Sequence, residues 1–278
     1  MTITVLLSIY SKNNPAHLDR AMQSIWNDQT LRPDKIVAVI DGPLPDELNT
    51  VVEKWKTMIG ENMTTILHKQ NLGLTRSLND GIGVITTDLI ARMDSDDISN
   101  PQRFELQHRY LEEHPDIDIV GGSLQEFDDT HENMGIRHYP ATHEEAVNTM
   151  HKVCPLAHPS VMMRRRIFDA GLHYNERFRT SQDIALWYDA VRQGYRMANL
   201  PEVIIRFRFA ADVYSRRSKA KAWNEFCIYI YGIRQLHGVF SLKYIYPVSR
   251  LIFRLMPERV IRWGYQSRLR RVVANEQS

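Results

Sequence analysis

The first hundred residues alternate short apolar runs with amphipathic runs of helical period. The apolar runs at 2–9, 35–40, 64–67 and 88–93 have the length and the β-rich composition of buried strands. The segments between them place their apolar residues on one helical face. Strands that alternate with helices predict an α/β fold with a mainly parallel sheet, in which ligands bind at the carboxyl ends of the strands.

Three of these predicted strands end in residues that suit a ligand site. Tyr10 follows the first strand, Asp41 follows the second, and the fourth opens onto the acidic stretch 94–97. Each residue has a plain structural alternative, since Tyr10 could only pack and Asp41 could only begin the turn at the next Gly-Pro pair. The recurrence at three strand ends favours a binding site at one edge of the sheet.

The acidic stretch contains Asp94, Ser95, Asp96 and Asp97. Asp94 and Asp96 should point to the same side of an extended chain, where two carboxylates repel each other unless a cation lies between them. Oxygen ligands suit Mg²⁺ or Mn²⁺ better than zinc, so Asp94 and Asp96 are the predicted metal ligands. The alternative is an acidic turn before a helix that Asn100 caps, and in either case Asp97 is expected to support the turn.

The second hundred residues predict less regular structure. Two further strands are expected at 117–120 and 123–127. A capping box of Thr142 and Glu145 predicts a helix that ends near residue 151.

Two residues of this half are candidate site residues. His158 lies in the irregular, proline-rich segment 154–160, although a lone histidine is more often structural than catalytic. Ser181 can cap a helix that runs to about residue 193, which places Asp183 in its first turn, where the helix dipole favours a carboxylate. A surface aspartate matched to the dipole would explain Asp183 equally well.

Charge is divided unevenly along the chain. Residues 213–278 contain 13 Lys/Arg and 3 Asp/Glu, which leaves 22 and 30 for residues 1–212. A basic extension on an acidic body indicates an anionic partner for the extension, either membrane phospholipid or nucleic acid.

Within this extension, residues 241–255 are predicted to form an amphipathic helix. Its apolar residues share one face, and Lys243, Arg250 and Arg254 share the opposite face. This pattern is typical of a helix that lies on an anionic membrane surface, and the alternative is an apolar face that packs on the rest of the protein. The apolar run 228–233 is too short to span a bilayer.

The two cysteines, Cys154 and Cys227, lie far apart and predict neither a disulfide framework nor a thiolate metal site. They favour a reducing compartment. The first residues also lack the basic region and the long apolar run of a signal peptide. The protein is therefore expected in the cytoplasm, peripherally associated with the inner membrane if the extension binds lipid.

Five short segments, in this order along the chain, resemble the inverting family 2 glycosyltransferases of the Rossmann-like GT-A fold. They are residues 5–10, 37–43, 71–74, 91–97 and 182–187. Within that family the likeness is to bacterial enzymes that build O-antigen and exopolysaccharide repeat units, such as the amylovoran type. The resemblance implies a GT-A catalytic domain over 1–212, with a nucleotide-sugar half that ends near residue 100, followed by a helical extension.

The resemblance also implies roles around the nucleotide. Tyr10 would stack on the base, Asp41 would accept a hydrogen bond from the base or ribose, and Arg76 would add a positive charge nearby. An exposed helical arginine explains Arg76 nearly as well. Four more arginines could close over the diphosphate or simply belong to the basic extension: Arg206, Arg208, Arg216 and Arg217.

For the reaction itself, the resemblance implies that Asp94 and Ser95 contact a UDP-sugar and that Asp94 and Asp96 hold Mn²⁺ or Mg²⁺ against its diphosphate. Asp183 would be the base that takes the proton of the acceptor hydroxyl. Many relatives carry an acidic residue just before that aspartate, whereas this chain has Gln182, so Asp183 has no adjacent substitute.

The resemblance further implies an undecaprenyl-diphosphate-linked sugar as acceptor and a β-linked product. Polymer-forming relatives carry a Gln-x-x-Arg-Trp motif, but here Arg259 stands where the glutamine would precede Arg262 and Trp263. This departure predicts the addition of a single hexose to each acceptor.

Two other functions are compatible with parts of the sequence. Two carboxylates after a strand also serve Mg²⁺-dependent nucleotidyltransferases and phosphohydrolases, although no nucleophile or phosphate loop accompanies them here. The basic extension could bind nucleic acid, but the segregation of its charges on one helical face favours a lipid or protein surface.

Overall fold

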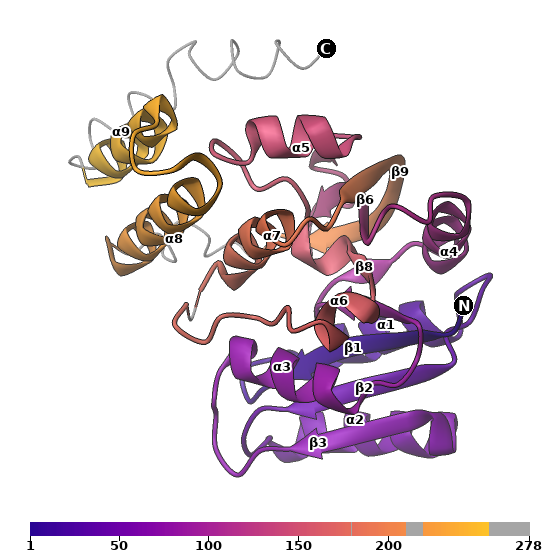
Figure 1. Ribbon diagram of the computed structural model, residues 1–278. Coiled ribbons are helices and arrows are strands. Elements are labelled where there is room, and N and C mark those ends of the chain that lie inside the picture. Colours follow the sequence, from indigo (N-terminus) through magenta and orange to yellow (C-terminus); the bar gives the residue numbers. More distant parts are fainter. Residues whose placement is uncertain (179, 210–218, 256–278) are drawn as a thin grey trace.

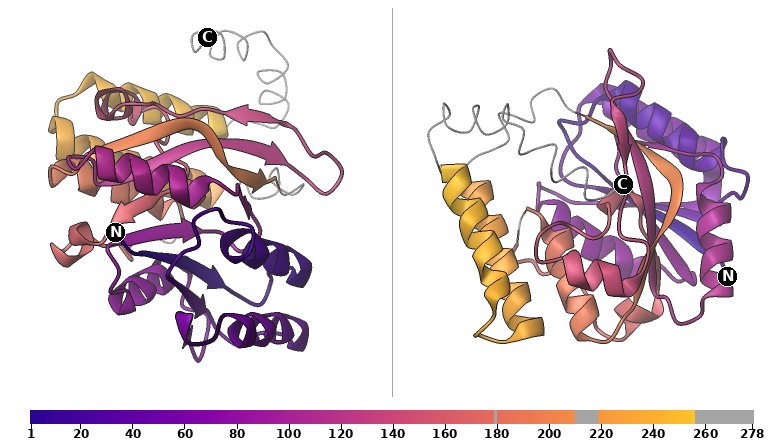
Figure 2. Two further views of the ribbon diagram at one scale, coloured as in Figure 1. Left: turned by 90° about the vertical axis from the view of Figure 1, so that its right-hand side faces the viewer. Right: turned by 90° about the horizontal axis from the view of Figure 1, so that it is seen from above.

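The structure, a computed structural model, describes residues 1–178, 180–209 and 219–255 (Figure 1). Within these residues, one mixed sheet has the strand order β3-β2-β1-β4-β8-β6-β9-β5, with β7 beside β6. Helices lie on both faces of this sheet (Figures 1 and 2). The α/β prediction is therefore confirmed.

The first half of the sheet is parallel. Its strands are β1 (Ile3–Ile9), β2 (Lys35–Ile40), β3 (Met63–Leu67) and β4 (Leu89–Met93). The connections contain α1 (Pro15–Trp26), α2 (Asp46–Ile59), the short 3-10 helix η1 (Gly60–Asn62) and α3 (Leu74–Val84). All four strands lie where the apolar runs predict them.

Alternate residues of these strands face two separate apolar cores. In β2, Ile36, Ala38 and Ile40 pack with α1 and α2, whereas Val37 and Val39 pack on the opposite face near α3. A strand that is covered on both faces needs apolar residues at every position, which explains the continuous apolar runs in the sequence.

The second half of the sheet mixes both strand directions. It contains β5 (Ile98–Ser99), β6 (Ile119–Phe127), β7 (Gly135–Arg137), β8 (Met162–Arg164) and β9 (Met197–Arg208). The pair β6–β9 is parallel, whereas β8 runs antiparallel to both β4 and β6. The prediction of a mainly parallel sheet thus holds for the first half only.

The helices of this half cover both faces of the strands. They are α4 (Arg103–Glu113), α5 (His143–Thr149), the 3-10 helix η2 (His158–Ser160), α6 (Arg166–Asp169) and α7 (Gln182–Arg192). The capping box of Thr142 and Glu145 is confirmed at the start of α5.

Two local predictions in this half are wrong. The strands expected at 117–120 and 123–127 form the single strand β6, whose pairing with β9 shifts register on either side of Ser123. Helix α4 begins at Arg103, and Asn100 does not cap it. The Asn100 amide instead donates a hydrogen bond of 2.7 Å to the carbonyl oxygen of Val203, because β9 passes close by.

Two further helices, α8 (Lys219–His237) and α9 (Ile245–Leu255), lie side by side, and α8 packs against α7 (Figures 1 and 2). A short 3-10 helix, η4 (Leu242–Tyr244), precedes α9, so the predicted helix 241–255 is shorter than expected. None of the helices in the three described segments combines the length and apolarity that a membrane crossing requires. The predicted domain boundary at 212–213 lies outside the described residues.

Helix α8 packs tightly on α7 at Gly232. A Cβ atom added there would lie 2.1 Å from ring atoms of Tyr188, and the Tyr231 hydroxyl donates a hydrogen bond of 2.7 Å to Asp189 on α7. Only a residue without a side chain allows this contact between the two helices.

We therefore expect Gly232→Ala to lower the free energy of unfolding by about 1–3 kcal/mol through overpacking. The matched control is Gly83→Ala in α3, where an added Cβ meets nothing within 4 Å. That change should leave stability unchanged or raise it by up to about 1 kcal/mol, because alanine favours helix. Urea unfolding followed by circular dichroism measures both, and equal midpoints would contradict the packing described here.

Candidate active site

Three parallel strands end at the same edge of the sheet, next to one another. Ile9 of β1 pairs with Ile40 of β2, and Leu7 of β1 pairs with Met93 of β4. The residues that follow these strands, Tyr10, Asp41 and Asp94, therefore leave the sheet at one edge. The strand register thus places the three predicted strand-end residues at the same edge of the sheet.

The acidic stretch forms a compact loop between β4 and β5. One carboxylate oxygen each of Asp94, Asp96 and Asp97 lies within 4.8 Å of the others. Strand β9 holds the loop from outside, since the Arg208 backbone N–H donates to Asp97 at 2.8 Å and its guanidinium donates to the Asp96 carbonyl at 3.0 Å. Asp97, expected only to support the turn, thus lies in the same carboxylate group as the two predicted ligands.

This loop concentrates negative charge in a partly buried place. Burial raises the pKa of Asp97 well above its ordinary value, and the charges of Asp94 and Asp96 raise it further. Burial, with the charge of Asp94, also raises the pKa of Asp96. The Oδ2 atom of Asp97 is buried without a hydrogen-bond partner among the described residues. Three close carboxylates, one with a free oxygen, fit a hard divalent cation such as Mn²⁺ or Mg²⁺. Ser95 is buried in the turn between them.

Asp183 is partly buried in the first turn of α7, as predicted. Burial raises the pKa of its carboxyl group, and the nearby positive charge of Arg92 opposes that rise. The Cys154 thiol lies 3.7 Å from Asp183 Oδ2. Ser181 occupies the N-cap position but does not cap the helix, because its backbone is left-handed with φ of 56°. A left-handed conformation is costly for serine and is often found near functional sites.

Arg92 connects the acidic loop to Asp183. It forms an ion pair with Asp94, and its charge acts on Asp96, Asp97 and Asp183. The predicted metal ligands and the predicted base therefore share one electrostatic environment. Arg92 was not among the residues expected at the site, because an arginine inside an apolar strand carries no motif of its own.

At the other end of the edge, Asp41 is a buried anchor of the 71–73 turn. Its carboxylate accepts hydrogen bonds from the backbone N–H groups of Leu72 at 2.7 Å and Gly73 at 2.9 Å, and it lies 3.1 Å from His68 Nδ1. The loop after Asp41 approaches this turn so closely that a Cβ added to Gly42 would lie 2.8 Å from the backbone nitrogen of Asn71. The φ angle of Gly42 is 91°, which also favours glycine. That Asp41 accepts a hydrogen bond from the base or ribose of a nucleotide remains a prediction.

Arg76 is linked to Asp41 through two intermediate side chains. Its guanidinium pairs with Asp80 at 2.9 Å, and Asp80 in turn lies 3.1 Å from His68 Nε2. His68 thus links Asp41 to the surface pair, a connection that no spacing in the sequence reveals. Tyr10 remains 39% exposed, as a residue that stacks on a base requires.

The remaining candidates divide between structural positions and residues outside the described segments. His158 is buried, with Nε2 2.7 Å from the Tyr174 hydroxyl and its ring edge-on to Trp187. Burial lowers its pKa well below the ordinary value, so the ring is neutral at physiological pH. Arg206 lies over the Phe127 ring at 4.8 Å. Residues with predicted roles that lie outside the described segments are Arg216, Arg217, Arg259, Arg262 and Trp263.

Comparison with known proteins agrees with this geometry. Residues 5–172 match the family described as glycosyl transferase family 2. The chain is 31% identical over 268 residues to the amylovoran biosynthesis glycosyltransferase AmsE of Erwinia amylovora, covering 95% of this chain and 97% of AmsE. It is 28% identical to an Escherichia coli UDP-Gal:α-D-GlcNAc-diphosphoundecaprenol β-1,3-galactosyltransferase, covering 96% of each chain.

Solved structures show the same fold. The chain superposes with a TM-score of 0.63 on residues 1–349 of Staphylococcus aureus TarS in complex with UDP-GlcNAc, at 14% identity and over 91% of this chain and 72% of that one. The TM-score is also 0.63 for a Pyrobaculum calidifontis mannosyltransferase in complex with GDP-Man and Mn²⁺, at 15% identity and over 90% and 68% of the chains.

The fold and the edge of strand ends define a glycosyltransferase of the GT-A class. The chain belongs to glycosyltransferase family 2, as the ordered segments indicate. This membership decides against the two other functions that the sequence left open, a different phosphate-active enzyme and a nucleic-acid-binding protein.

The raised pKa of Asp97 leads to a prediction about metal-free protein. A carboxyl group whose folded pKa lies above its unfolded value stabilises the fold at low pH, and this stability is lost as the pH rises through the folded pKa. Asp97→Asn removes that charge but can still accept the Arg208 N–H. In EDTA at pH 7–8 the variant should therefore melt a few degrees above wild type, since about 1 kcal/mol shifts the midpoint by roughly 2–4 °C in a chain of this size.

Differential scanning fluorimetry from pH 5 to pH 8 measures this difference, which should shrink toward low pH. Mn²⁺ at one hundred times its Kd for wild type should stabilise wild type by about 2.7 kcal/mol. It should stabilise the variant less. The control is Asp129→Asn, an aspartate near Arg208 that is 71% exposed and should change little. A variant that melts with wild type at every pH would contradict the charge repulsion described here.

Proposed function

We propose that this protein transfers a single hexose from a UDP-sugar to a sugar linked to undecaprenyl diphosphate, during assembly of an O-antigen or exopolysaccharide repeat unit. The transfer is metal-dependent and inverts the anomeric centre, so that a β-glycosidic bond forms. The observation that carries the proposal is the convergence of three carboxylates and Asp183 around Arg92. The names of the galactosyltransferase and AmsE support the kinds of donor, acceptor and pathway.

Each residue has a distinct task in this reaction. Tyr10 and Asp41 bind the nucleoside, and Asp94, Asp96 and Asp97 hold the divalent cation. When bound, such a cation stabilises the charge that develops on the departing diphosphate. The TarS complex supports a uridine nucleotide as donor, and the mannosyltransferase complex supports Mn²⁺ as one suitable ion.

Asp183 acts as the general base on the acceptor hydroxyl. Burial raises the pKa of Asp183 above its ordinary value, which makes its carboxylate a stronger base toward the acceptor hydroxyl. Gln182 is buried beside it, so no second carboxylate precedes Asp183 in the turn. A direct attack by the activated hydroxyl inverts the anomeric centre in one step.

We expect Asp183→Asn to lower the transfer rate about 10²–10⁴-fold, the usual contribution of a general base. The control, Asp189→Asn, changes another aspartate of α7 whose contact with the Tyr231 hydroxyl an asparagine oxygen can maintain, so its rate should stay close to wild type. The assay is UDP release with UDP-sugars and a synthetic lipid-diphosphate sugar, with product mass to identify the transferred sugar. Full activity of Asp183→Asn would remove Asp183 from the reaction, and a wild-type product without added sugar would overturn the proposed function.

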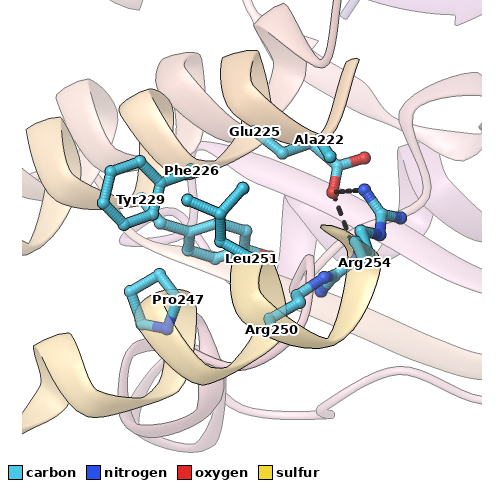
Figure 3. Close-up of a pocket in the computed structure, with 8 residues that line it drawn as sticks. All are labelled: Ala222, Glu225, Phe226, Tyr229, Pro247, Arg250, Leu251 and Arg254. Carbon is cyan, nitrogen blue, oxygen red and sulfur yellow. Dashed lines mark hydrogen bonds and ion pairs between the residues drawn. The ribbon is translucent and has the colours of Figure 1, made fainter. Parts of the chain in front are cut away.

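The two C-terminal helices support a membrane-bound acceptor. In α9, Arg250 and Arg254 turn inward and pair with Glu225 of α8 at 3.2 and 2.7 Å (Figure 3). The opposite face of α9 exposes apolar residues, with Ile245 65% and Ile252 55% accessible. Arg250 and Arg254 of the predicted basic face therefore contact α8 instead of a membrane. The alternative, in which the apolar face packs on the rest of the protein, does not hold for Ile245 and Ile252.

The exposed apolar side chains of α9 point to shallow hydrophobic insertion as one means of attachment. The loop before α9 extends this surface, since Phe240 is 99% and Leu242 84% accessible. We propose that these residues enter the cytoplasmic leaflet of the inner membrane and place the active site beside the lipid-linked acceptor.

Ile252→Glu should therefore reduce co-flotation with liposomes at least several-fold, since burial of one isoleucine side chain contributes about 1.5–3 kcal/mol. The control is Met58→Glu in α2, a helical residue of similar exposure, 50%, far from α9 in the sequence. Vesicles with and without phosphatidylglycerol separate this insertion from the attraction of the basic extension to anionic lipid. Undiminished flotation of Ile252→Glu would exclude this face from membrane binding.

A further inference from the structure

Arg92 is a buried arginine on the active-site face of β4. Within β4, Leu89, Ala91 and Met93 pack into one core, so Arg92 points to the other face, with Ile90. Asp94, two residues later, leaves the strand on this same side. Helix α7 covers this side, which explains how Arg92 acts on both Asp94 and Asp183.

Two of the three guanidinium nitrogens of Arg92 have no hydrogen-bond partner among the residues that the structure describes. Nη2 pairs with Asp94, but Nε and Nη1 are buried and donate to no atom of the described residues. The residue as a whole is only 2% exposed. Buried N–H donors are nearly always paired, and each one left unpaired costs about 1–3 kcal/mol.

In the neighbouring buried arginine, Arg103, all three guanidinium nitrogens contact protein atoms. Arg103 is also fully buried, yet its Nε donates to Gln107 at 3.1 Å and its Nη2 donates to the Arg92 carbonyl at 2.7 Å. Nη1 of Arg103 lies 3.4 Å from the Met93 sulfur. Arg103 thus donates its hydrogen bonds to the protein itself. Arg92, in contrast, has two N–H donors without a partner among the described residues.

The position of these donors relative to the reaction indicates what they bind. Asp94 is among the carboxylates that hold the cation and diphosphate in the proposed function, and Asp183 is its base. In an inverting transfer the leaving diphosphate and the base lie on opposite sides of the anomeric carbon, so the sugar ring lies between them. Arg92 pairs with Asp94, and its charge acts on Asp183.

We propose that Arg92 is a specificity-determining residue that donates hydrogen bonds from Nε and Nη1 to hydroxyl oxygens of the transferred hexose. This inference rests on the proposed function. A guanidinium has only donors, so it selects ligand oxygens that can accept, and sugar hydroxyls and phosphate oxygens share that chemistry. The hexose is the assigned partner, and the phosphate is an outcome that the test separates.

The test is calorimetric binding in the presence of Mn²⁺ to wild type, Arg92→Lys and Arg92→Gln. The probes are UDP, GDP, UDP-glucose, UDP-galactose, UDP-GlcNAc and GDP-mannose. Lysine keeps the charge that Asp94 needs, which favours folding of that variant, and circular dichroism checks each protein. In Arg92→Lys, which keeps a positive charge beside Asp94, we expect affinity for the cognate nucleotide sugar to fall about 10-fold or more, as for loss of a hydrogen bond to a charged group, while affinity for the nucleoside diphosphate stays within about twofold. Arg92→Gln also removes that charge, so it should lose affinity for the nucleotide sugar at least as strongly.

The matched control is Arg103→Lys, which should lower the thermal midpoint without separating the two affinities. An equal loss for nucleoside diphosphate and nucleotide sugar would assign Arg92 to the diphosphate and overturn the proposal, as would no loss for either. Wild-type protein that binds the nucleoside diphosphate but none of the nucleotide sugars would overturn the proposed donor class and this inference together. Cognate binding by wild type, with no selective loss in the variants, would overturn this inference alone.

Discussion

The mutual repulsion of three carboxylates in one loop is the constraint on which the active site depends. Asp94, Asp96 and Asp97 place oxygens within 4.8 Å of one another, in a region where burial already disfavours charge. Protein groups offset only part of this cost. Arg92 pairs with Asp94 from inside, and Arg208 holds the backbone of the loop from β9. The remaining excess of negative charge is what a divalent cation would neutralise in the proposed function.

The supporting elements explain why the second half of the sheet departs from simple parallel order. Strand β8 runs antiparallel next to β4, and the backbone N–H of Arg92 donates to the Val161 carbonyl at 2.9 Å just before β8. Strand β9 pairs with β5 directly after the acidic loop. The loop is thus held on both sides by strands that come from much later in the chain. Helix α7 then brings Asp183 to the same place.

The C-terminal helices are joined to this centre by direct packing. Helix α8 contacts α7 through Gly232 and Tyr188, and α9 is attached to α8 through Glu225. The apolar face of α9 is therefore connected to the helix that carries Asp183 by two tight helix contacts. In the proposed function, a membrane that receives α9 would hold Asp183, the proposed base, at a defined position relative to the lipid surface.

The sequence by itself determined the strands β1 to β4, because a strand buried on both faces must be apolar at every position. It also identified Tyr10, Asp41 and Asp94 at strand ends, since parallel strands align those ends whatever the rest of the chain does. Local chemistry sufficed again for the capping box of Thr142 and Glu145.

Only the tertiary structure decided what depends on contacts between distant segments. Asn100 bonds to Val203 rather than capping α4, and Arg250 and Arg254 turn toward Glu225 rather than outward. The environment of Arg92 is of the same kind. Its partners Asp94 and Val161 and its neighbour Asp183 come from three separate stretches, and the free donors on its buried side chain become visible only when all three are in place. Burial and charge compensation are properties of the assembled fold, so no local pattern could reveal them.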